Sequence, residues 1–300
     1  MREREGLVTF RYDTNAFWYK GNTHIHSVAS DGGKTLDQLA DLYGTAGYHF
    51  LFRTDHWISS DAANGKQDYP VLWLDGVELD GRDRSGAIYH VVCLGTFQPL
   101  NANMGLVWAM EEVRAQGGLL ILAHPHWMGN SFDDALRHGF HGVEVYNNVC
   151  NWLNGKGYSG PYWSHMLDKN PRVLGIASDD AHITSEHPVW NGGWIMVNAP
   201  DLTRESIMQA VHAGNFYSSC GPEIHSIEYD GANVRITCSP VKFARLAGPA
   251  CDGMRQGASD DDMLTEIEFP VDHSWSYAYV EIEDANGRKA WTNNLFIQDE

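Results

Sequence analysis

The sequence has 300 residues, of which 43 % are hydrophobic and 20 % are charged, and this composition is typical of a globular protein. Its formal net charge of −18 argues against binding to nucleic acid or to an anionic membrane surface. The unusual feature is the 15 histidines, because imidazole is the commonest metal ligand in proteins.

The cysteines and the N-terminal sequence indicate in which cellular compartment the protein is expected. The 5 cysteines are widely spaced and contain no Cys-x-x-Cys pair, so they predict neither a disulfide framework nor a thiolate zinc site. Residues 1–6 lack the apolar region of a signal peptide, and no apolar run reaches the length of a membrane span. We therefore expect a soluble protein of the cytoplasm.

Short β-rich runs alternate with helix-patterned stretches between residue 22 and about residue 220, which is typical of βα units around a parallel sheet or barrel. The first helix is predicted from Thr35 to Ala46, with a capping box formed by Thr35 and Gln38. Further helices are expected from Leu106 to Gly117 and from Thr203 to Ala213. The expected strands are 22–26, 49–55, 71–79, 87–95, 118–124, 142–147 and 173–179.

The pattern changes after Gly221-Pro222. One hairpin is expected around Asp230-Gly231 and a second around residues 284–287, with an acidic, mobile loop from Cys251 to Asp262 between them. This tail is too short for a β-sandwich of typical size. We predict a barrel domain over residues 1–222 and a small all-β domain over residues 223–300.

The clearest chemical signal is the segment from Gly21 to Gly33. On a strand, side chains alternate between faces, so His24 and His26 would point to the same side. The small residues that follow form a turn that could bring Asp31 back over the end of the strand. Two histidines packed in a strand are an equally good interpretation of this pair taken alone.

More candidate metal ligands follow the ends of other predicted strands, where the active sites of barrels are built. Each of these residues alone could be a helix cap, a core histidine or a turn residue. Candidate ligands at the ends of so many strands are hard to explain by separate structural roles. Nitrogen and oxygen ligands without sulfur suit zinc, manganese or iron, and the set is large enough for two or three divalent ions. The set comprises His24, His26, Asp31, His56, Glu78, His90, His124, Asp180 and His182.

These segments together resemble the motifs of the PHP (polymerase and histidinol phosphatase) superfamily, in the same order, over about residues 20 to 220. The matching runs are Thr23–Ser27 with Ser30–Gly32, Thr54–His56, Gly76–Glu78, Ala123–Pro125 and Ser178–His182. The resemblance implies a distorted (β/α)7 TIM-like barrel with a trinuclear metal centre, whose ligands by position are the nine residues above. His90 is matched on the shortest motif.

The C-terminal part sharpens this resemblance. The runs Phe216–Ile224 and Ala290–Asn294 are similar to the branch that contains carbamate-insecticide hydrolases, the CehA/McbA-like metallohydrolases, whose members carry a small β-domain after the barrel. Asn294 departs from this branch, which usually has proline there.

Such a centre would hydrolyse phosphate esters. A metal-bridged water with a lowered pKa supplies hydroxide at neutral pH, and the metal charge stabilises the transition state. We predict a phosphoesterase for a small anionic substrate. Arg53, Arg82 and Arg84 are candidates for binding phosphate. His126 is a candidate for protonating the leaving group, and Arg53 is a second candidate catalytic residue. Glu144 and Asn147 are candidates for binding substrate or orienting ligands.

Other functions fit parts of the pattern. The same centre could hydrolyse a carboxyl ester or a carbamate, with an apolar leaving group held by some of Trp57, Trp127, Trp152, Trp163, Trp190 and Trp194. An amidohydrolase barrel also begins with His-x-His, but no lysine lies between Lys66 and Lys156 to supply its bridging carboxylated lysine. A barrel that only binds metal or a partner is the non-enzymatic alternative.

Overall fold

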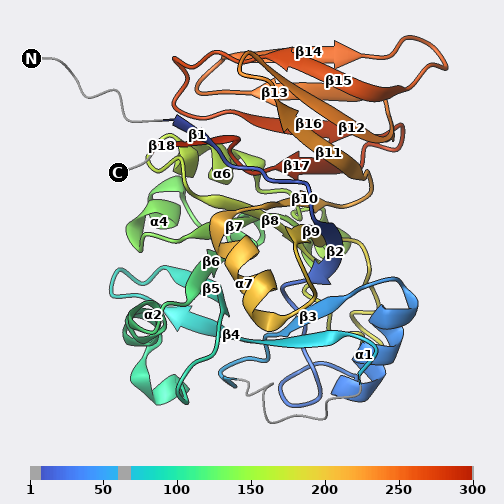
Figure 1. Ribbon diagram of the computed structural model, residues 1–300. Coiled ribbons are helices and arrows are strands. Elements are labelled where there is room, and N and C mark those ends of the chain that lie inside the picture. Colours follow the sequence, from blue (N-terminus) through green and yellow to red (C-terminus); the bar gives the residue numbers. More distant parts are fainter. Residues whose placement is uncertain (1–7, 60–68, 299–300) are drawn as a thin grey trace, which may run out of the picture.

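The computed structural model describes residues 8–59 and 69–298. Its largest feature is a mixed sheet of 13 strands in the order β14-β13-β16-β17-β10-β9-β2-β3-β4-β5-β6-β7-β8. In Figure 1 the C-terminal strands form a layer above the part of the sheet that the helices surround. Among the described residues, no helix is both long and apolar enough to cross a membrane.

Six strands of this sheet overlap the predicted barrel strands, and a seventh, β2, ends where the first predicted strand begins. Parallel pairing joins β2 to β3 and β3 to β4, and also β6 to β7 and β7 to β8. The carboxyl ends of these six strands therefore lie on one side of the sheet. The seven are β2 (Phe17–Asn22), β3 (Phe50–Arg53), β4 (Leu72–Arg82), β5 (Ile88–Leu94), β6 (Leu119–Leu122), β7 (Gly142–Asn147) and β8 (Leu174–Ser178).

The barrel prediction needs correction at β5, which runs antiparallel to both β4 and β6. Only residues 83–87 separate β4 from β5, and a connection this short can form a hairpin but not a helical crossover. The first and last strands of this sheet, β14 and β8, do not pair with each other, so the described strands form an open sheet rather than a closed barrel. A single parallel bridge, from Ile25 to Ala181, links the segments that follow β2 and β8.

The strand predicted at 22–26 is wrong, because β2 ends at Asn22. Asn22 Oδ1 accepts a hydrogen bond from the His24 backbone N–H at 3.1 Å, a local bond that turns the chain out of the ladder. Ile25 instead lies between the ends of β3 and β8: its N–H donates to Thr54 Oγ1 at 2.9 Å, and His26 N–H donates to Ala181 O at 3.0 Å.

The helices surround the sheet (Figure 1). The predicted capping box is present: Thr35 Oγ1 accepts from Gln38 N, and Gln38 Oε1 accepts from Thr35 N. Leu39, Ala40 and Tyr43 form the buried face of that helix. The helices are α1 (Leu36–Thr45), α2 (Leu106–Ala115), α3 (Pro125–Met128), α4 (Phe132–Arg137), α5 (Asn148–Asn154), α6 (Gly160–Leu167) and α7 (Arg204–Ala213), with a 3-10 turn at Ala102–Met104.

Both C-terminal hairpins are confirmed, as β11 with β12 and β16 with β17. The loop predicted between Cys251 and Asp262 is corrected, because it contains β14, which pairs with β13 along its whole length. The remaining strands are β1 (Val8–Phe10), β9 (Trp194–Ala199), β10 (Phe216–Ser219), β11 (Ile224–Tyr229), β12 (Asn233–Val241), β13 (Phe243–Ala247), β14 (Gly253–Gly257), β15 (Leu264–Pro270), β16 (Tyr279–Glu283), β17 (Lys289–Thr292) and β18 (Phe296–Gln298).

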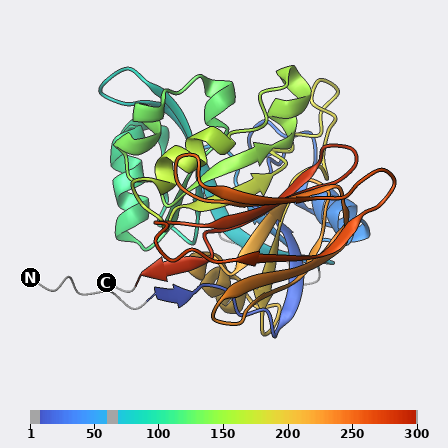
Figure 2. The ribbon, with the colours of Figure 1, turned by 90° about the horizontal axis from the view of Figure 1, so that it is seen from above.

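The C-terminal strands are joined to the rest by direct pairing. β17 pairs with β10, so the large sheet continues across residue 222. β1 pairs with β18, and the two strands lie side by side in Figure 2. The division into domains at 222 stays a prediction. Asn294, which stands where the resembling branch has proline, is buried, and its amide accepts from Ala278 N and donates to Pro171 O.

The neighbouring Asn293 ties this region to the site-bearing strands. Its Oδ1 accepts from Gly175 N on β8 at 2.9 Å, and its Nδ2 donates to Gly214 O at 3.2 Å and Phe216 O at 3.1 Å. The side chain is 1 % exposed, so water cannot replace these bonds easily.

We expect Asn293→Ala to lower the free energy of unfolding by about 3 kcal/mol, because it leaves buried backbone groups without partners. Urea unfolding measures the change. Asn286→Ala is the control, since Asn286 is exposed in the β16–β17 turn and should shift stability by less than about 0.5 kcal/mol. Equal stability of wild type and Asn293→Ala would contradict this role.

Candidate metal centre

The segment between β2 and α1 places the first two histidines. His24 and His26 are both fully buried, and their ring centroids are 5.1 Å apart. Because Ile25 between them is bonded to the ends of β3 and β8, both imidazoles point toward the carboxyl ends of the parallel strands. The predicted pairing of the two rings is therefore present, although they do not lie on a regular strand.

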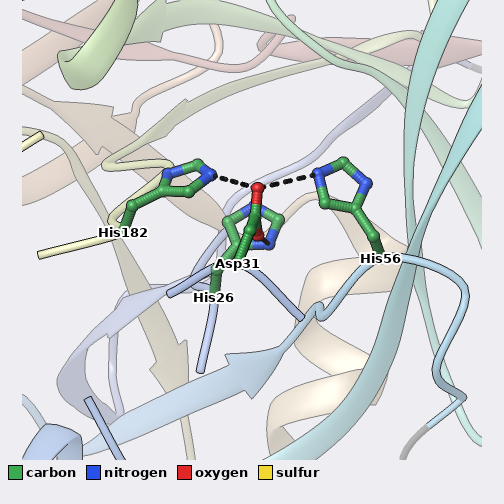
Figure 3. A group of neighbouring side chains, drawn as sticks. All are labelled: His26, Asp31, His56 and His182. Atoms are coloured by element: carbon green, nitrogen blue, oxygen red, sulfur yellow. Dashed lines mark hydrogen bonds and ion pairs between the residues drawn. The ribbon is translucent and has the colours of Figure 1, made fainter. Parts of the chain in front are cut away.

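Asp31 returns to this pair through a tight turn. Asp55 is fully buried and fixes the turn, because its carboxylate accepts from Ser27 N at 2.7 Å and from Ser30 Oγ at 2.9 Å. Gly32 is required here, since a Cβ atom would lie 2.2 Å from His26 O. This packing sets the Asp31 carboxylate over the ring of His26, as Figure 3 shows.

In Figure 3 the Asp31 carboxylate lies between His56 and His182. Its Oδ2 is 3.2 Å from His182 Nε2 and 3.8 Å from His56 Nε2, and its Oδ1 is 3.4 Å from His26 Nδ1. The side chain of Asp31 is 52 % exposed, so the cluster opens to solvent on this side.

Glu78 on β4 is the centre of the cluster. Its carboxylate is 1 % exposed and is surrounded by four imidazoles from three different segments of the chain. The nitrogen-to-oxygen distances are 2.9 Å to His90 Nδ1, 3.0 Å to His24 Nε2, 3.1 Å to His26 Nε2 and 3.3 Å to His56 Nε2. His90, although on the antiparallel β5, thus reaches the same group as the others.

His124 and Asp180 complete the cluster from the segments after β6 and β8. Asp180 Oδ1 lies 3.2 Å from His26 Nε2, and Asp180 Oδ2 lies 3.6 Å from His124 Nε2. Both residues have positive φ, 29° for His124 and 55° for Asp180. Non-glycine residues in this region cost about 1–3 kcal/mol each and concentrate at functional sites.

The charges of the cluster shift its pKa values in opposite directions. Burial alone lowers the pKa of His26, but hydrogen bonds to Asp180 and Glu78 outweigh it and raise the pKa to about 9. Burial also lowers the pKa of His24, but the negative charges of Asp180, Glu78 and Glu144 outweigh burial. The pKa of His24 is therefore raised well above its ordinary value. The imidazoles hold the pKa of Glu78 well below its usual range despite burial.

The donor atoms fit divalent ions. Ligands about 2.1 Å from a common tetrahedral ion lie about 3.4 Å apart, close to the spacings above. His124 Nδ1 is also buried without a hydrogen-bond partner in the described structure. Donor atoms within 4.8 Å of one another form five groups: His26, Asp31, His56 and His182; His24, His26, Glu78 and Asp180; His56, Glu78 and His90; His24, His124 and Glu144; and His124, Cys150 and Asp180.

Two residues predicted to bind substrate or to orient ligands contact the candidate ligands directly. Glu144 is 1 % exposed, and its carboxylate accepts from His24 Nδ1 at 2.7 Å, Ser178 Oγ at 2.6 Å and His124 N at 2.9 Å. Asn147, fully buried, donates to Glu144 and to Asp180. Both were predicted to bind substrate or to orient ligands, and the geometry favours orienting.

Asp80 is a supporting residue that the sequence analysis missed. Its Oδ1 lies 3.1 Å from His56 Nδ1, and the hydrogen bond to His56 lowers the pKa of Asp80. A carboxylate bonded to the far nitrogen of a histidine fixes its tautomer and the direction of its other nitrogen. The signal was available, because Asp80 lies two residues after Glu78 and so on the same face of β4.

Two of the three predicted phosphate-binding arginines, Arg53 and Arg82, have partners outside the donor groups. Arg53 Nε donates to Asp55 at 2.6 Å, which makes it part of the support under the Ser27–Ser30 turn. Arg82 is exposed and donates to Gly86 O at 2.8 Å, and Arg84 is exposed in the same hairpin. The structure does not bring these side chains into the histidine cluster.

His126 is exposed on α3, and its Nδ1 lies 3.0 Å from Tyr158 O, so this nitrogen carries the proton and donates. Of the six tryptophans, Trp127 packs edge-on against His124 with centroids 5.3 Å apart, and Trp152 is 47 % exposed beside His187. Trp57 follows His56 directly, and the other three lie in packed hydrophobic clusters: Trp163, Trp190 and Trp194.

The raised pKa of His26 predicts how pH acts on this site. In the metal-free protein its contribution to stability is complete below the unfolded pKa of 6.5 and is lost as pH rises through about 9. A metal ion must displace the same proton, so metal affinity rises over this window. Calorimetry of metal-free and zinc-loaded protein should show stability falling with pH only in the former; parallel curves would contradict the assignment.

Asp80→Ala should weaken metal binding about 10- to 100-fold, because His56 loses the bond that orients its ring. Titration of the metal-free protein with zinc against a competing chelator measures the affinity. Arg82→Ala is the matched control on the same strand and should bind zinc as the wild type does. Unchanged affinity in Asp80→Ala would show that His56 needs no such support.

Comparisons with known proteins bear on the fold. No protein-family model and no curated protein matches the chain. A solved two-domain protein from Bacteroides vulgatus, which contains a predicted PHP-like metal-dependent phosphoesterase, is 16 % identical with a TM-score of 0.54, covering 100 % of this chain and 99 % of its own.

Two further solved structures, each 14 % identical, match part of the chain. A candidate metal-dependent phosphoesterase from Bifidobacterium adolescentis has a TM-score of 0.44 and covers 64 % of this chain and 96 % of its own. An amidohydrolase from Chromobacterium violaceum, with bound sulfate and no metal, has a TM-score of 0.41 and covers 65 % and 96 %. As the sequence resemblance predicted, the chain shares the fold of a PHP-like protein, and it does so over its whole length.

Proposed function

We propose that the protein is a metal-dependent phosphoesterase that acts on a small anionic phosphate ester. The observation that carries this proposal is the convergence of six histidines and three carboxylates from separate segments on one cluster with Glu78 at its centre. A core does not require this, because burying so many ionisable groups is costly unless they bind something.

The number of ions follows from the donor groups. The group around Asp31 and the group around Asp180 share only His26, and the group of His56, Glu78 and His90 adds a third set. We propose two or three ions of zinc, manganese or iron, as nitrogen and oxygen donors suit each of these metals. When bound, they would supply a lowered pKa for water and positive charge for the transition state.

The charge balance favours an anionic substrate. Three divalent ions would carry about +6 against the three ligating carboxylates, so an acidic protein would present a locally cationic site. The open side of the site is formed by Asp31, which is 52 % exposed, and by His56 and His90, which are 23 % and 24 % exposed. Substrate would enter there, since His24 and His26 are closed off.

The chain's own residues have separate parts in this proposal. Glu78 and Asp180 hold the imidazoles, and Glu144 fixes the direction of His24. We assign protonation of the leaving group to His126 in its imidazolium form: Nδ1–H is held by Tyr158 O, and Nε2–H, which has no protein partner in the described structure, gives its proton to the leaving oxygen. The binding of phosphate falls to the metal centre rather than to the arginines.

Hydrolysis of a carboxyl ester or carbamate by the same centre is the second candidate. The observation that favours it is the indole of Trp127 against the ligand His124, which places an apolar surface beside the donor groups. It would suit an aromatic leaving group.

The two candidates separate in one substrate panel. We expect protein loaded with zinc, manganese or iron to hydrolyse p-nitrophenyl phosphate or bis(p-nitrophenyl) phosphate faster than p-nitrophenyl acetate or a naphthyl carbamate. Activity confined to the acetate or the carbamate would replace the phosphoesterase by the second candidate. No activity on any of the four with a metal-loaded centre would contradict both.

His24→Ala should lower kcat by about a hundredfold or more and reduce the bound metal, because it removes a ligand next to both Glu78 and Asp180. Circular dichroism checks that the variant is folded. His225→Ala, at an exposed histidine of the C-terminal strands, is the control and should keep wild-type activity. Near wild-type turnover in His24→Ala would exclude the proposed centre.

A further inference from the structure

Cys150 lies next to the metal centre but is not among the nine predicted ligands. It is on α5, directly after β7, and is 1 % exposed. Its Sγ, one ring nitrogen of His124 and one carboxylate oxygen of Asp180 lie within 4.8 Å of one another. The thiol therefore lies in a buried part of the cluster, since His124 and Asp180 are buried as well.

The environment of Cys150 differs from that of the other buried cysteines. Cys93 Sγ donates to Val91 O, Cys220 Sγ contacts Tyr158 Oη, and Cys238 Sγ is 4.0 Å from Leu264 O. In the described structure the Cys150 thiol has no such partner. Its surroundings are instead ionic. Burial raises the pKa of the thiol most, and the negative charges of Asp180, Glu144 and Glu78 raise it further.

A second, independent feature points to a ligand at this place. His124 is 2 % exposed, and its Nδ1 is a buried nitrogen without a hydrogen-bond partner in the described structure. Thus the thiol and the imidazole of this donor group each carry an atom without a hydrogen-bond partner in the described structure. A cation would satisfy both, and it would offset the carboxylate charge that keeps the thiol neutral.

We propose that Cys150 is a sulfur ligand of the metal centre, shared with His124 and Asp180, and that it makes this position selective for zinc over manganese. Coordination replaces the S–H bond by a metal–sulfur bond and releases the proton to solvent. Thiolate is a soft ligand that suits zinc, whereas manganese prefers carboxylate, carbonyl and water. The inference rests on the metal centre of the proposed function and adds a residue and a metal preference to it.

Cobalt is the probe that tests the sulfur ligand directly. In a Cys251→Ser background, which removes the exposed cysteine, metal-free protein is loaded with Co²⁺ and its absorption spectrum is recorded. We expect a near-ultraviolet thiolate-to-cobalt charge-transfer band beside the visible d–d bands. Cys150→Ser should lose the charge-transfer band and keep the d–d bands, because the nitrogen and oxygen ligands remain.

The same pair of proteins tests selectivity. Cys150→Ser should lose about tenfold or more of its affinity for the weakest-bound zinc ion and none of its manganese affinity, in competition with a chelator. An equal loss for both metals would show that Cys150 supports the fold of the site rather than ligating.

A measurement without the Cys150 variant keeps the proposal testable if that variant does not fold. X-ray absorption of zinc-loaded Cys251→Ser protein should require a sulfur neighbour at about 2.3 Å in addition to nitrogen and oxygen. Bound zinc without a sulfur neighbour, or cobalt d–d bands without a charge-transfer band, would overturn the role of Cys150 and leave the metal centre standing. Failure to bind any metal would overturn the proposed function itself.

Discussion

The buried carboxylate of Glu78 is the interaction on which the rest of the site depends. A carboxylate at 1 % exposure is stable only if its charge is compensated, and four imidazoles supply that compensation at 2.9 to 3.3 Å. Those imidazoles come from the segments after β2 and β3 and from β5. The position of Glu78 on β4, between β3 and β5, is what allows it to reach all of them.

Three other buried acids hold the frame in which this centre sits. Asp179 points away from the cluster and accepts from Asn191 N, Gly192 N and Gly193 N, so two consecutive aspartates serve opposite purposes. Asp55 fixes the turn that carries Asp31, and Glu144 fixes His24. Part of the negative charge of the chain thus belongs to buried carboxylates that accept hydrogen bonds from backbone N–H groups and from histidine.

The sequence predicted which side chains meet in the cluster better than it predicted the sheet. His56, Glu78, His124 and Asp180 could be found because strand ends are recognisable and a motif resemblance placed them in order. The direction of β5 was missed, since its short hairpin was read as another βα unit. His24 and His26 were paired correctly, but a side-chain bond from Asn22 ends the strand before them.

The supporting residues were harder to predict because their roles depend on burial and on side-chain direction. From the sequence alone, the charged side chains of Glu144 and Arg53 could contact a substrate. Their contacts with His24 and Asp55 in the structure show that they face the protein. Cys150 gave no signal, because a single cysteine has no spacing pattern to read. Its nearness to His124 arises from the packing of α5 behind the site.

The central claim, that the cluster around Glu78 binds two or three divalent ions, is tested most directly by anomalous diffraction from crystals of zinc-loaded protein. The account predicts anomalous peaks between His24, His26 and Asp180, and between Asp31, His56 and His182, with any third ion near Glu78 and His90 or near His124 and Cys150. Well-ordered crystals grown with excess zinc that show no anomalous peak within this cluster would contradict it.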